Sequence, residues 1–193
     1  TYYSNHIAGN RLTRDQTRTI FENNAIGTTN GYVNVDDIFE TTNHFRCIDM
    51  IIDRAGERLS EALIRDLHRM LKTGMSDSEA CLPKELPHRI TDLLAEYNDK
   101  KPKTFEDILD FHQRLDAIRP LWDGSGRVGR LIMFKECLAN GFVPFIITDE
   151  LKPFYAHGLQ QWPVAKGDLM CICLTAQDRY KEELDYYGIK YSR

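Results

Sequence analysis

The sequence predicts an all-α protein that folds as a single domain. Its 193 residues are enough to bury a sizeable core and still fall within the usual size of one domain. Along most of the chain, apolar residues recur at spacings of three and four, the period of an amphipathic helix. The one apolar, β-branched segment, residues 142–147, contains Pro144 and is expected to be buried and extended rather than a central strand.

The first part of the chain predicts two amphipathic helices. Thr13 and Gln16 form a capping box, so a helix is expected from there to about residue 24, before Gly27. A longer helix is expected over residues 35–54. Its apolar face is formed by Ile38, Phe45, Ile48, Ile51 and Ile52.

The next helix is expected to follow Ser60 as its cap and to stop at Gly74. His68 adjoins its apolar face and is interpreted as a hydrogen-bonded packing residue rather than a ligand. Residues 75–87 show no alternating strand pattern and are interpreted as a linker.

Five helices are expected downstream. Thr104 and Asp107 resemble a cap for the helix that leads into a glycine-containing loop at residues 119–130. The helix that follows this loop is the most apolar in the chain and is expected at the centre of the bundle. The five helices cover residues 88–98, 104 to the loop, the loop to Gly141, about 150–162 and about 168–186.

The loop at residues 119–130 carries the main functional signal. A glycine-containing loop that opens a helix aligns backbone N–H groups, and the helix dipole adds partial positive charge, so together they form an anion site. Arg127 and Arg130 lie three residues apart and can reach over the same helix end. Asp123 offers a hard oxygen ligand for a magnesium ion that bridges phosphates. A glycine-rich turn with two solvated arginines is the alternative.

This loop resembles the signature of the Fic (Fido) family, His-Pro-Phe-x-Asp/Glu-Gly-Asn-Gly-Arg-x-x-Arg. The resemblance extends to residues 131–135 downstream and residues 43–45 upstream. It implies one Fic domain over residues 1–193, a helical bundle around a central helix–loop–helix. Within it, residues 1–27 would form an inhibitory-type segment and helix, and residues 28–193 the Fic core. The matching residues are Pro120, Asp123, Gly124, Gly126, Arg127 and Arg130.

Family members typically transfer AMP from ATP to a hydroxyl group of a target protein. The resemblance implies that Asp123 holds Mg²⁺ and that Arg130 binds the γ-phosphate. Tyr155 is a candidate to stack on the adenine, with a core or interface aromatic as the alternative. The remaining phosphate contacts would come from Gly124, Ser125, Gly126 and Arg127.

Three signature positions depart from the family pattern. Arg119 stands where the family has the histidine that takes the proton from the target hydroxyl, and an arginine with a pKa above about 12 has no free lone pair for that role. Leu121 replaces a phenylalanine that anchors the loop. Ser125 replaces an asparagine that contacts phosphate, and its hydroxyl offers one donor where the amide offered two.

Two further segments resemble regulatory or target-binding parts of the family. Residues 4–10 resemble the inhibitory motif Ser/Thr-x-x-x-Glu-Gly-Asn through Ser4, Gly9 and Asn10, but Ala8 occupies the glutamate position. The resemblance implies that the motif's glutamate pairs with the second arginine of the signature, here Arg130, and so blocks productive placement of the γ-phosphate. Since the methyl group of Ala8 cannot form this ion pair, autoinhibition by this segment is expected to be absent. The alternative is a helix lead-in that packs through Ile7.

Relatives carry a target-binding β-hairpin flap at the position of residues 75–87, which is predicted here to be short or missing.

Three functional hypotheses follow. The first is a Fic-type AMP transferase, impaired by Arg119 and unbraked by Ala8. The second is a catalytically silent Fic module that binds a nucleotide or a partner protein. The third is a competent transferase in which Ala8, Arg119 or both are introduced changes. The sequence leaves all three open.

Composition restricts the partners and the compartment. A net charge of −4 provides no basic field for nucleic acid. No apolar run reaches 18 residues, so no membrane span is expected. An odd number of cysteines, five, without a Cys-x-x-Cys pair fits a reduced, cytoplasmic protein. The expected partner is a Ser, Thr or Tyr hydroxyl of a target protein or of the chain itself. A homodimer is a further option, with Trp162 and the Tyr186–Tyr187 pair expected at the surface.

Overall fold

The computed structural model describes residues 1–27, 31–76, 88–121 and 123–191. Within these residues the chain is all-helical, as predicted, and contains no strand. Its helices are α1 (Tyr2–Ile7), α2 (Arg14–Asn23), α3 (Val35–Asp53), α4 (Glu61–Lys72), α5 (His88–Asp99), α6 (Phe105–Ile118), α7 (Ser125–Ala139), α8 (Lys152–Gln161) and α9 (Lys166–Tyr186).

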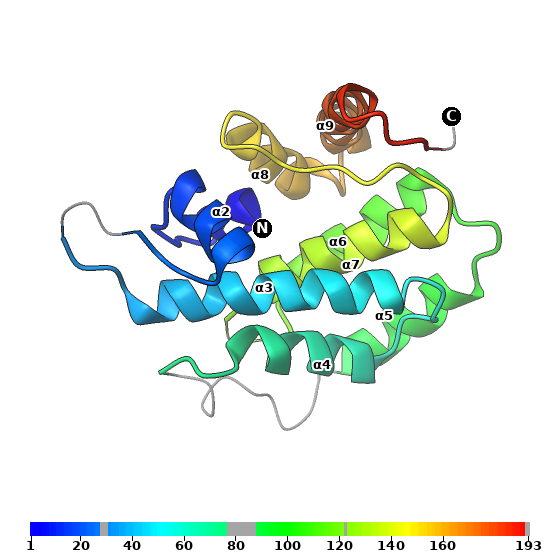
Figure 1. Cartoon of the computed structure of the whole chain (residues 1–193). Coiled ribbons are helices and arrows are strands. Elements are labelled where there is room, and N and C mark those ends of the chain that lie inside the picture. Colours follow the sequence, from blue (N-terminus) through cyan, green and yellow to red (C-terminus); the bar gives the residue numbers. More distant parts are fainter. Residues whose placement is uncertain (28–30, 77–87, 122, 192–193) are drawn as a thin grey trace.

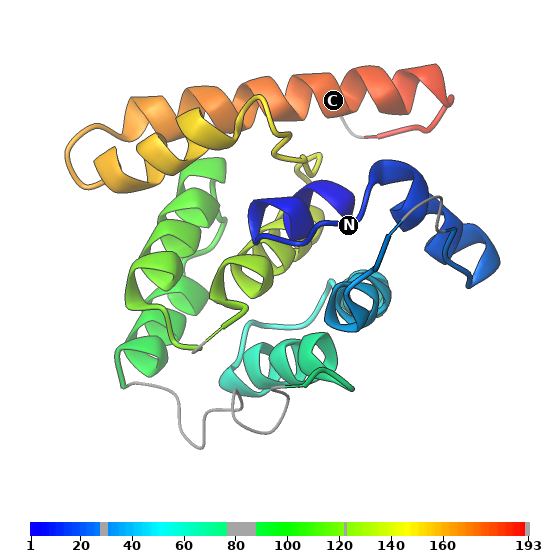
Figure 2. The same ribbon diagram turned by 90° about the vertical axis from the view of Figure 1, so that its left-hand side faces the viewer.

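Helix α7 lies at the centre of the bundle. It packs against α6, α3, α4 and the short N-terminal α1 (Figure 1). Helices α8 and α9 form an antiparallel pair that lies across one side of the bundle (Figure 2). Most of the first two turns of α7 and much of its remainder are buried. The prediction that this helix occupies the centre is therefore confirmed.

Local capping fixes where the main helices begin. The Thr13 hydroxyl accepts the Gln16 N–H and the Gln16 side chain accepts the Thr13 N–H, which completes the predicted capping box. Ser60 caps α4, as predicted, by accepting the Leu63 N–H. Thr104 forms a second capping box, at α6, with Asp107. Each cap satisfies N–H groups that have no partner inside the helix.

Helix α3 differs from the sequence prediction in what it buries. Ile51 is fully buried, but Ile52, assigned to the same face, is 51% exposed. The N-terminal half of the buried face is polar and contains Glu40, Asn43 and His44. The apolar stripe therefore describes only part of α3, because Glu40 pairs with Arg127 and Asn43 donates to the backbone carbonyls of Leu71 and Thr73.

The segment over residues 142–147 is extended without forming a strand and is mostly buried, as predicted, although Ile146 is 40% exposed. Val143 and Phe145 are buried, and the Val143 carbonyl accepts a hydrogen bond from Gln177 Nε2 at 2.6 Å. The predicted fate of the flap falls on residues 77–87, which lie outside the described residues.

The prediction that Trp162 lies at the surface is wrong. It is 2% exposed, and its indole N–H donates to Asp110 Oδ1 at 2.9 Å. It belongs to the core beneath α8 and α9 because both its ring and its polar tip find partners there. Tyr186 and Tyr187 are exposed, as predicted.

None of the helices in the described ranges carries an apolar stretch of the length that crossing a bilayer requires.

The close approach of α8 and α9 depends on Gly158. A Cβ atom at this position would lie 2.8 Å from the Leu169 Cα and 2.9 Å from its backbone nitrogen. Both neighbours are backbone atoms and cannot rotate away, so only a glycine allows this spacing.

We expect Gly158→Ala to lower the free energy of unfolding by about 1–3 kcal/mol, because overpacking outweighs the gain in helix propensity. Gly167→Ala is the matched control, since Gly167 in the first turn of α9 has open space at its Cβ position. The control is expected to be neutral or to stabilise by up to about 1 kcal/mol. Urea unfolding of the three proteins measures both effects, and equal midpoints for the two variants would contradict the role of Gly158.

Candidate functional site

The candidate site is built where α6 ends and α7 begins. Arg119 terminates α6 in the left-handed conformation (φ 46°, ψ 62°), with its N–H donating to the Leu115 carbonyl at 3.2 Å. Gly124 precedes α7 at φ 89°. A Cβ at Gly124 would lie 3.3 Å from the Leu71 side chain and 3.4 Å from that of His68. A glycine is therefore required both by the backbone and by the packing of the loop on α4.

The loop between these residues is held from below. Leu121 is buried in the core and takes the anchoring place that the family gives to phenylalanine. His68 Nε2 donates to the Asp123 carbonyl oxygen at 2.8 Å, which confirms its interpretation as a hydrogen-bonded packing residue. These contacts fix the loop against α4.

Ser125 does not direct its hydroxyl to a ligand. Its Oγ accepts the Leu121 N–H at 3.1 Å and donates to the Leu121 carbonyl at 2.9 Å. The hydroxyl is thus used inside the loop, because it lies next to both backbone groups of Leu121. Only the backbone N–H of Ser125 remains to serve the predicted phosphate contact.

A row of alternating charges runs beneath the loop. Lys72 Nζ donates to Asp123 Oδ2 at 2.6 Å, and Arg127 donates to the same oxygen at 2.9 Å. Arg127 also forms an ion pair with Glu40 of α3. Glu40 in turn accepts from Asn10 Nδ2 at 2.8 Å. This row, which we call the charge ladder (Asn10, Glu40, Arg127, Asp123 and Lys72), connects the N-terminal segment to α3, α7, the loop and α4.

The charge ladder bears on the predicted magnesium site. Asp123 is the predicted metal ligand, yet one of its oxygens already accepts hydrogen bonds from two cations. Among the described residues, no group of three metal-ligating side chains comes together. Asp123 is therefore already used in a structural ion pair, and its role as a magnesium ligand stays a prediction.

Arg130 lies on the other side of the loop and is half-buried. Its Nε donates to Ser4 Oγ at 3.0 Å, and its terminal nitrogen donates to the Ser4 carbonyl at 2.8 Å. The N-terminal segment thus engages Arg130 through Ser4, although Ala8 at the glutamate position makes no ion pair. The resemblance implied a contact between position 8 and Arg130, whereas the residue of this segment that contacts Arg130 is Ser4. Gly9 and Asn10 lie further along the same turn, where Asn10 joins the charge ladder.

Tyr155 supports Arg130 from within the core. The residue is 4% exposed, its hydroxyl hydrogen-bonds His112 Nε2, and it interacts electrostatically with the nearby Arg130. This corrects the assignment of Tyr155 to adenine stacking, because a ring buried on both faces offers none to a base. Tyr155 is a positioning residue for Arg130.

His112 completes this group as a neutral imidazole. Burial, together with the positive charge of Arg130, lowers the pKa of His112 to about 4. Gly129 makes room for the ring, since a Cβ there would lie 3.2 Å from it. A neutral Nε2 accepts the Tyr155 hydroxyl proton, and that leaves the tyrosine oxygen free to accept from Arg130.

These elements surround a pocket of about 430 Å³. Ile7 and Ala8 of the N-terminal segment form one wall, and the loop and the start of α7 form another. Its charged lining consists of Asp116, Arg119, Asp123, Arg127 and Arg130. The pocket gathers the predicted site residues 119, 123–127 and 130 and Ala8, but not Tyr155. Its chemistry is that of an anion receptor at a helix N-terminus.

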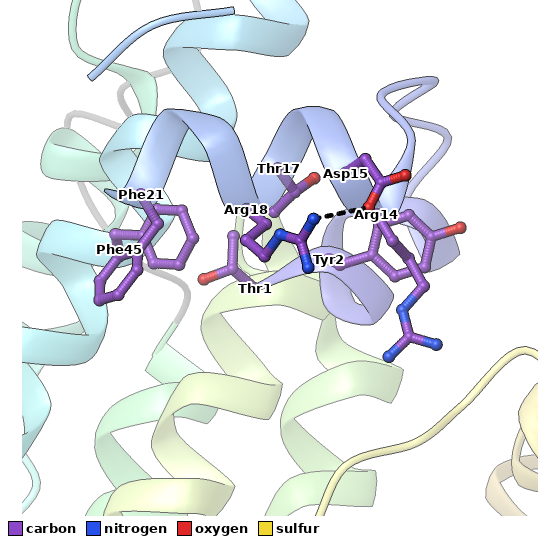
Figure 3. Close-up of a pocket in the computed structure, with 8 residues that line it drawn as sticks. All are labelled: Thr1, Tyr2, Arg14, Asp15, Thr17, Arg18, Phe21 and Phe45. Atoms are coloured by element: carbon purple, nitrogen blue, oxygen red, sulfur yellow. Dashed lines mark ion pairs between the residues drawn. The ribbon is translucent and has the colours of Figure 1, made fainter. Parts of the chain in front are cut away.

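A second pocket, of about 580 Å³, lies between the N-terminal segment, α2 and α3 (Figure 3). Arg14 and Arg18 both line it, and Arg18 pairs with Asp15 at 3.3 Å on an exposed helix surface (Figure 3). None of the signature residues lines this pocket, so it is not the site that the sequence predicted.

Sequence reasoning missed Glu40 and Lys72, the two ladder residues outside the signature and the N-terminal segment. Lys72 follows the apolar positions of α4 at helical spacing, four residues after His68, and is 1% exposed. A lysine on the buried stripe of a helix was therefore a usable signal for a buried partner. Glu40 had no such signal, because it lies in a largely polar stretch of α3.

The comparisons with known proteins agree with this geometry. The sequence model of the Fic/DOC family matches residues 36–137, more than half of the chain, and the chain therefore belongs to the Fic/DOC family. The matched range covers nearly all of α3 to α7, the elements that carry the loop and the charge-ladder residues other than Asn10. No curated protein sequence matches the chain.

Solved structures show the same fold. A Fic-domain signalling protein from Bacteroides thetaiotaomicron has 24% sequence identity and a TM-score of 0.75, over 92% of this chain and 80% of that one. Fic-1 from C. elegans, as an E274G variant, has 18% identity and a TM-score of 0.79 over 96% of this chain. A Fic family protein from Desulfovibrio desulfuricans has 19% identity and a TM-score of 0.72 over 99%. This chain spans only 62% and 65% of the latter two structures.

The buried, neutral His112 predicts a pH-dependent stability. Its folded pKa lies below the unfolded value, so the unfolded chain takes up a proton first as the pH falls. Stability is therefore fully present above about pH 6.5 and declines toward the folded pKa of about 4. Between pH 7 and pH 5 the expected loss from this residue is about 2 kcal/mol.

We expect His112→Gln to remove this part of the pH dependence, whatever its effect on stability at pH 7. His157→Gln is the control, because His157 is largely exposed on α8. Urea unfolding at the two pH values measures the slope. The assignment fails if His112→Gln and the parent lose the same stability on acidification.

Proposed function

We propose that this protein is a Fic-type protein AMP transferase whose transfer step is impaired. ATP would bind with its phosphates against the loop and the first turn of α7, where Gly124, Gly126 and the backbone N–H groups form the receptor. The family generally uses ATP and Mg²⁺, and Arg130 would contact the terminal phosphate. The acceptor would be a Ser, Thr or Tyr hydroxyl of a target protein.

One observation carries this proposal: the position of Arg119. Its backbone closes α6 directly opposite the N-terminus of α7, and its side chain lines the pocket. This is the position at which the family has a general base, and a guanidinium takes up no proton near neutral pH. Loss of a positioned base typically costs about 10²–10⁴-fold in rate. Binding and in-line positioning would persist, so slow transfer is expected.

A second candidate is a Fic module that binds nucleotide without transfer. Two observations favour it. Asp123 is engaged by Lys72 and Arg127, and Arg130 is engaged by Ser4. A site whose charged groups are held in this way is suited to binding a nucleotide without reacting with it. Signalling would then follow from the nucleotide-bound state. Binding that survives in the absence of transfer separates the two candidates.

The proposal also covers the binding partners and the cellular compartment of the protein. The acceptor hydroxyl would lie on another protein or on the chain itself. The exposed Tyr186 and Tyr187, whose rings meet edge to face at 5.0 Å, would supply a small surface for self-association. Neither nucleic acid nor a membrane is a proposed partner, and the proposed compartment is the cytoplasm.

The test restores the missing base. We expect Arg119→His to gain the mass of one or more AMP groups on incubation with ATP and Mg²⁺. The parent chain is expected to react about 10²–10⁴-fold more slowly, in line with the usual contribution of a general base. Intact-mass spectrometry over time measures both rates without knowledge of the target.

Arg119→Gln is the matched control, since glutamine removes the charge without supplying a base. At saturating ATP it should be no faster than the parent. Modification of the parent at the rate of Arg119→His would show that the base is dispensable. No modification of any variant, together with retained nucleotide binding, would favour the silent module.

A further inference from the structure

The two cations that hold Asp123 have a consequence for the ligand. We propose that the signature site binds nucleotide phosphates without a divalent cation, and that Arg119 supplies the positive charge a metal would otherwise bring. This inference rests on the proposed function, since it concerns the same pocket. It specifies the ligand as the metal-free polyphosphate of a nucleotide.

The first step of the argument is that Asp123 is committed to protein cations. Lys72 Nζ and Arg127 both bind Oδ2, at 2.6 and 2.9 Å. Lys72 is almost completely buried, so its ammonium cannot withdraw into solvent. The Asp123 side chain is 49% exposed, but a divalent cation on this carboxylate would stand next to two fixed positive charges, at a separation well inside the Debye length of about 8 Å, so salt would screen the repulsion only weakly.

The second step is that no other carboxylate is placed to take over. Glu40 is buried and shared between Arg127 and Asn10. Asp116 is the other carboxylate that lines the pocket, and the described residues contain no group of three metal-ligating side chains. Magnesium in nucleotide sites keeps several waters and is held through one or two carboxylates and the substrate phosphates, so the engagement of Asp123 takes away the carboxylate on which such a site would depend.

The third step is that the pocket presents its own cations. Arg119 is exposed at the end of α6 and lines the pocket together with Arg130. Its left-handed backbone fixes the root of the side chain opposite the N-terminus of α7. A guanidinium binds two phosphate oxygens at once and keeps its charge at any physiological pH. With Asp123 neutralised, Arg119 and Arg130 outweigh Asp116, and a fully charged polyphosphate is the matching ligand.

The test measures ADP binding by calorimetry in EDTA and in excess Mg²⁺, with the whole chain. We expect the affinity in EDTA to equal or exceed that in Mg²⁺, because the metal would compete with Arg119 for the phosphates. Arg119→Gln is expected to weaken binding in EDTA by about tenfold or more, the usual scale for a lost charge-assisted contact. An affinity at least about tenfold higher in Mg²⁺ than in EDTA for the parent would overturn the proposal.

A lysine variant tests whether the charge of Lys72 is what keeps Mg²⁺ away from Asp123. Lys72→Met keeps the length of the side chain and removes one cation from Asp123, so Mg²⁺ should now strengthen ADP binding. Lys100→Met is the matched control, because Lys100 forms a similar pair with Asp107 at 2.9 Å outside the pocket lining. Its response to Mg²⁺ should equal that of the parent. Melting curves confirm that each variant is folded.

The outcomes separate the two proposals. Binding that requires Mg²⁺ in the parent refutes the metal-free ligand and leaves the proposed nucleotide site intact. An absence of ADP and ATP binding under both conditions refutes the proposed function, and this inference with it. Equal responses of the parent and Lys72→Met to Mg²⁺ would refute the role of the lysine as the excluding charge.

Discussion

The structure of the site depends on the charge ladder beneath the signature loop. Glu40, Arg127, Asp123 and Lys72 alternate in sign, and each interior member touches two partners. Asp123 is half exposed, whereas Glu40, Arg127 and Lys72 are buried. A buried pair such as Glu40–Arg127 adds little net stability, because desolvation offsets attraction, but removal of one partner leaves an unpaired buried charge that costs about 3–5 kcal/mol. The ladder therefore acts mainly on geometry. It ties α3, α4 and α7 to the loop, so the angle at which α7 meets the pocket follows from charge pairing as well as from apolar packing.

A second polar group, formed by Arg130, Tyr155 and His112, lies on the other side of the loop. It too fixes geometry through polar contacts. Arg130 is held by Ser4 from outside the core and by Tyr155 from inside it. His112 must remain neutral to accept from Tyr155, and burial beside Arg130 keeps its pKa low. Because Tyr155 lies on α8 and Ser4 on α1, the orientation of one arginine links both ends of the chain. The N-terminal segment therefore contributes to the site although it carries alanine at the position of the family's glutamate.

The features that were predicted correctly from the sequence are those fixed by residues close together in the chain. The capping residues Thr13, Ser60 and Thr104 were identified correctly, because each cap is completed within three residues. The loop was located because its glycines and arginines are adjacent in sequence. What escaped prediction is decided by distant partners. Glu40 reaches Arg127 across the fold, Ser125 turns its hydroxyl back to Leu121, and Tyr155 is buried by α9 and the core. Periodicity also misassigned Ile52 and part of α3, since it assumes that a buried face is apolar.

Arg119 shows why binding and turnover are separable in this fold. A general base needs a lone pair that is free at neutral pH, whereas a phosphate receptor gains from a charge that is never lost. One side chain at the end of α6 cannot meet both requirements, so the residue there decides which of the two the pocket favours. The neighbouring groups act in the same direction. The pairing of Asp123 with Lys72 withdraws a metal ligand, and the loss of that ligand makes a permanent cation at position 119 more valuable for holding phosphate. Under the proposed function, the two features would be parts of one electrostatic arrangement, in which positive charge from the protein holds the phosphates where a metal would otherwise do so and the general base is missing.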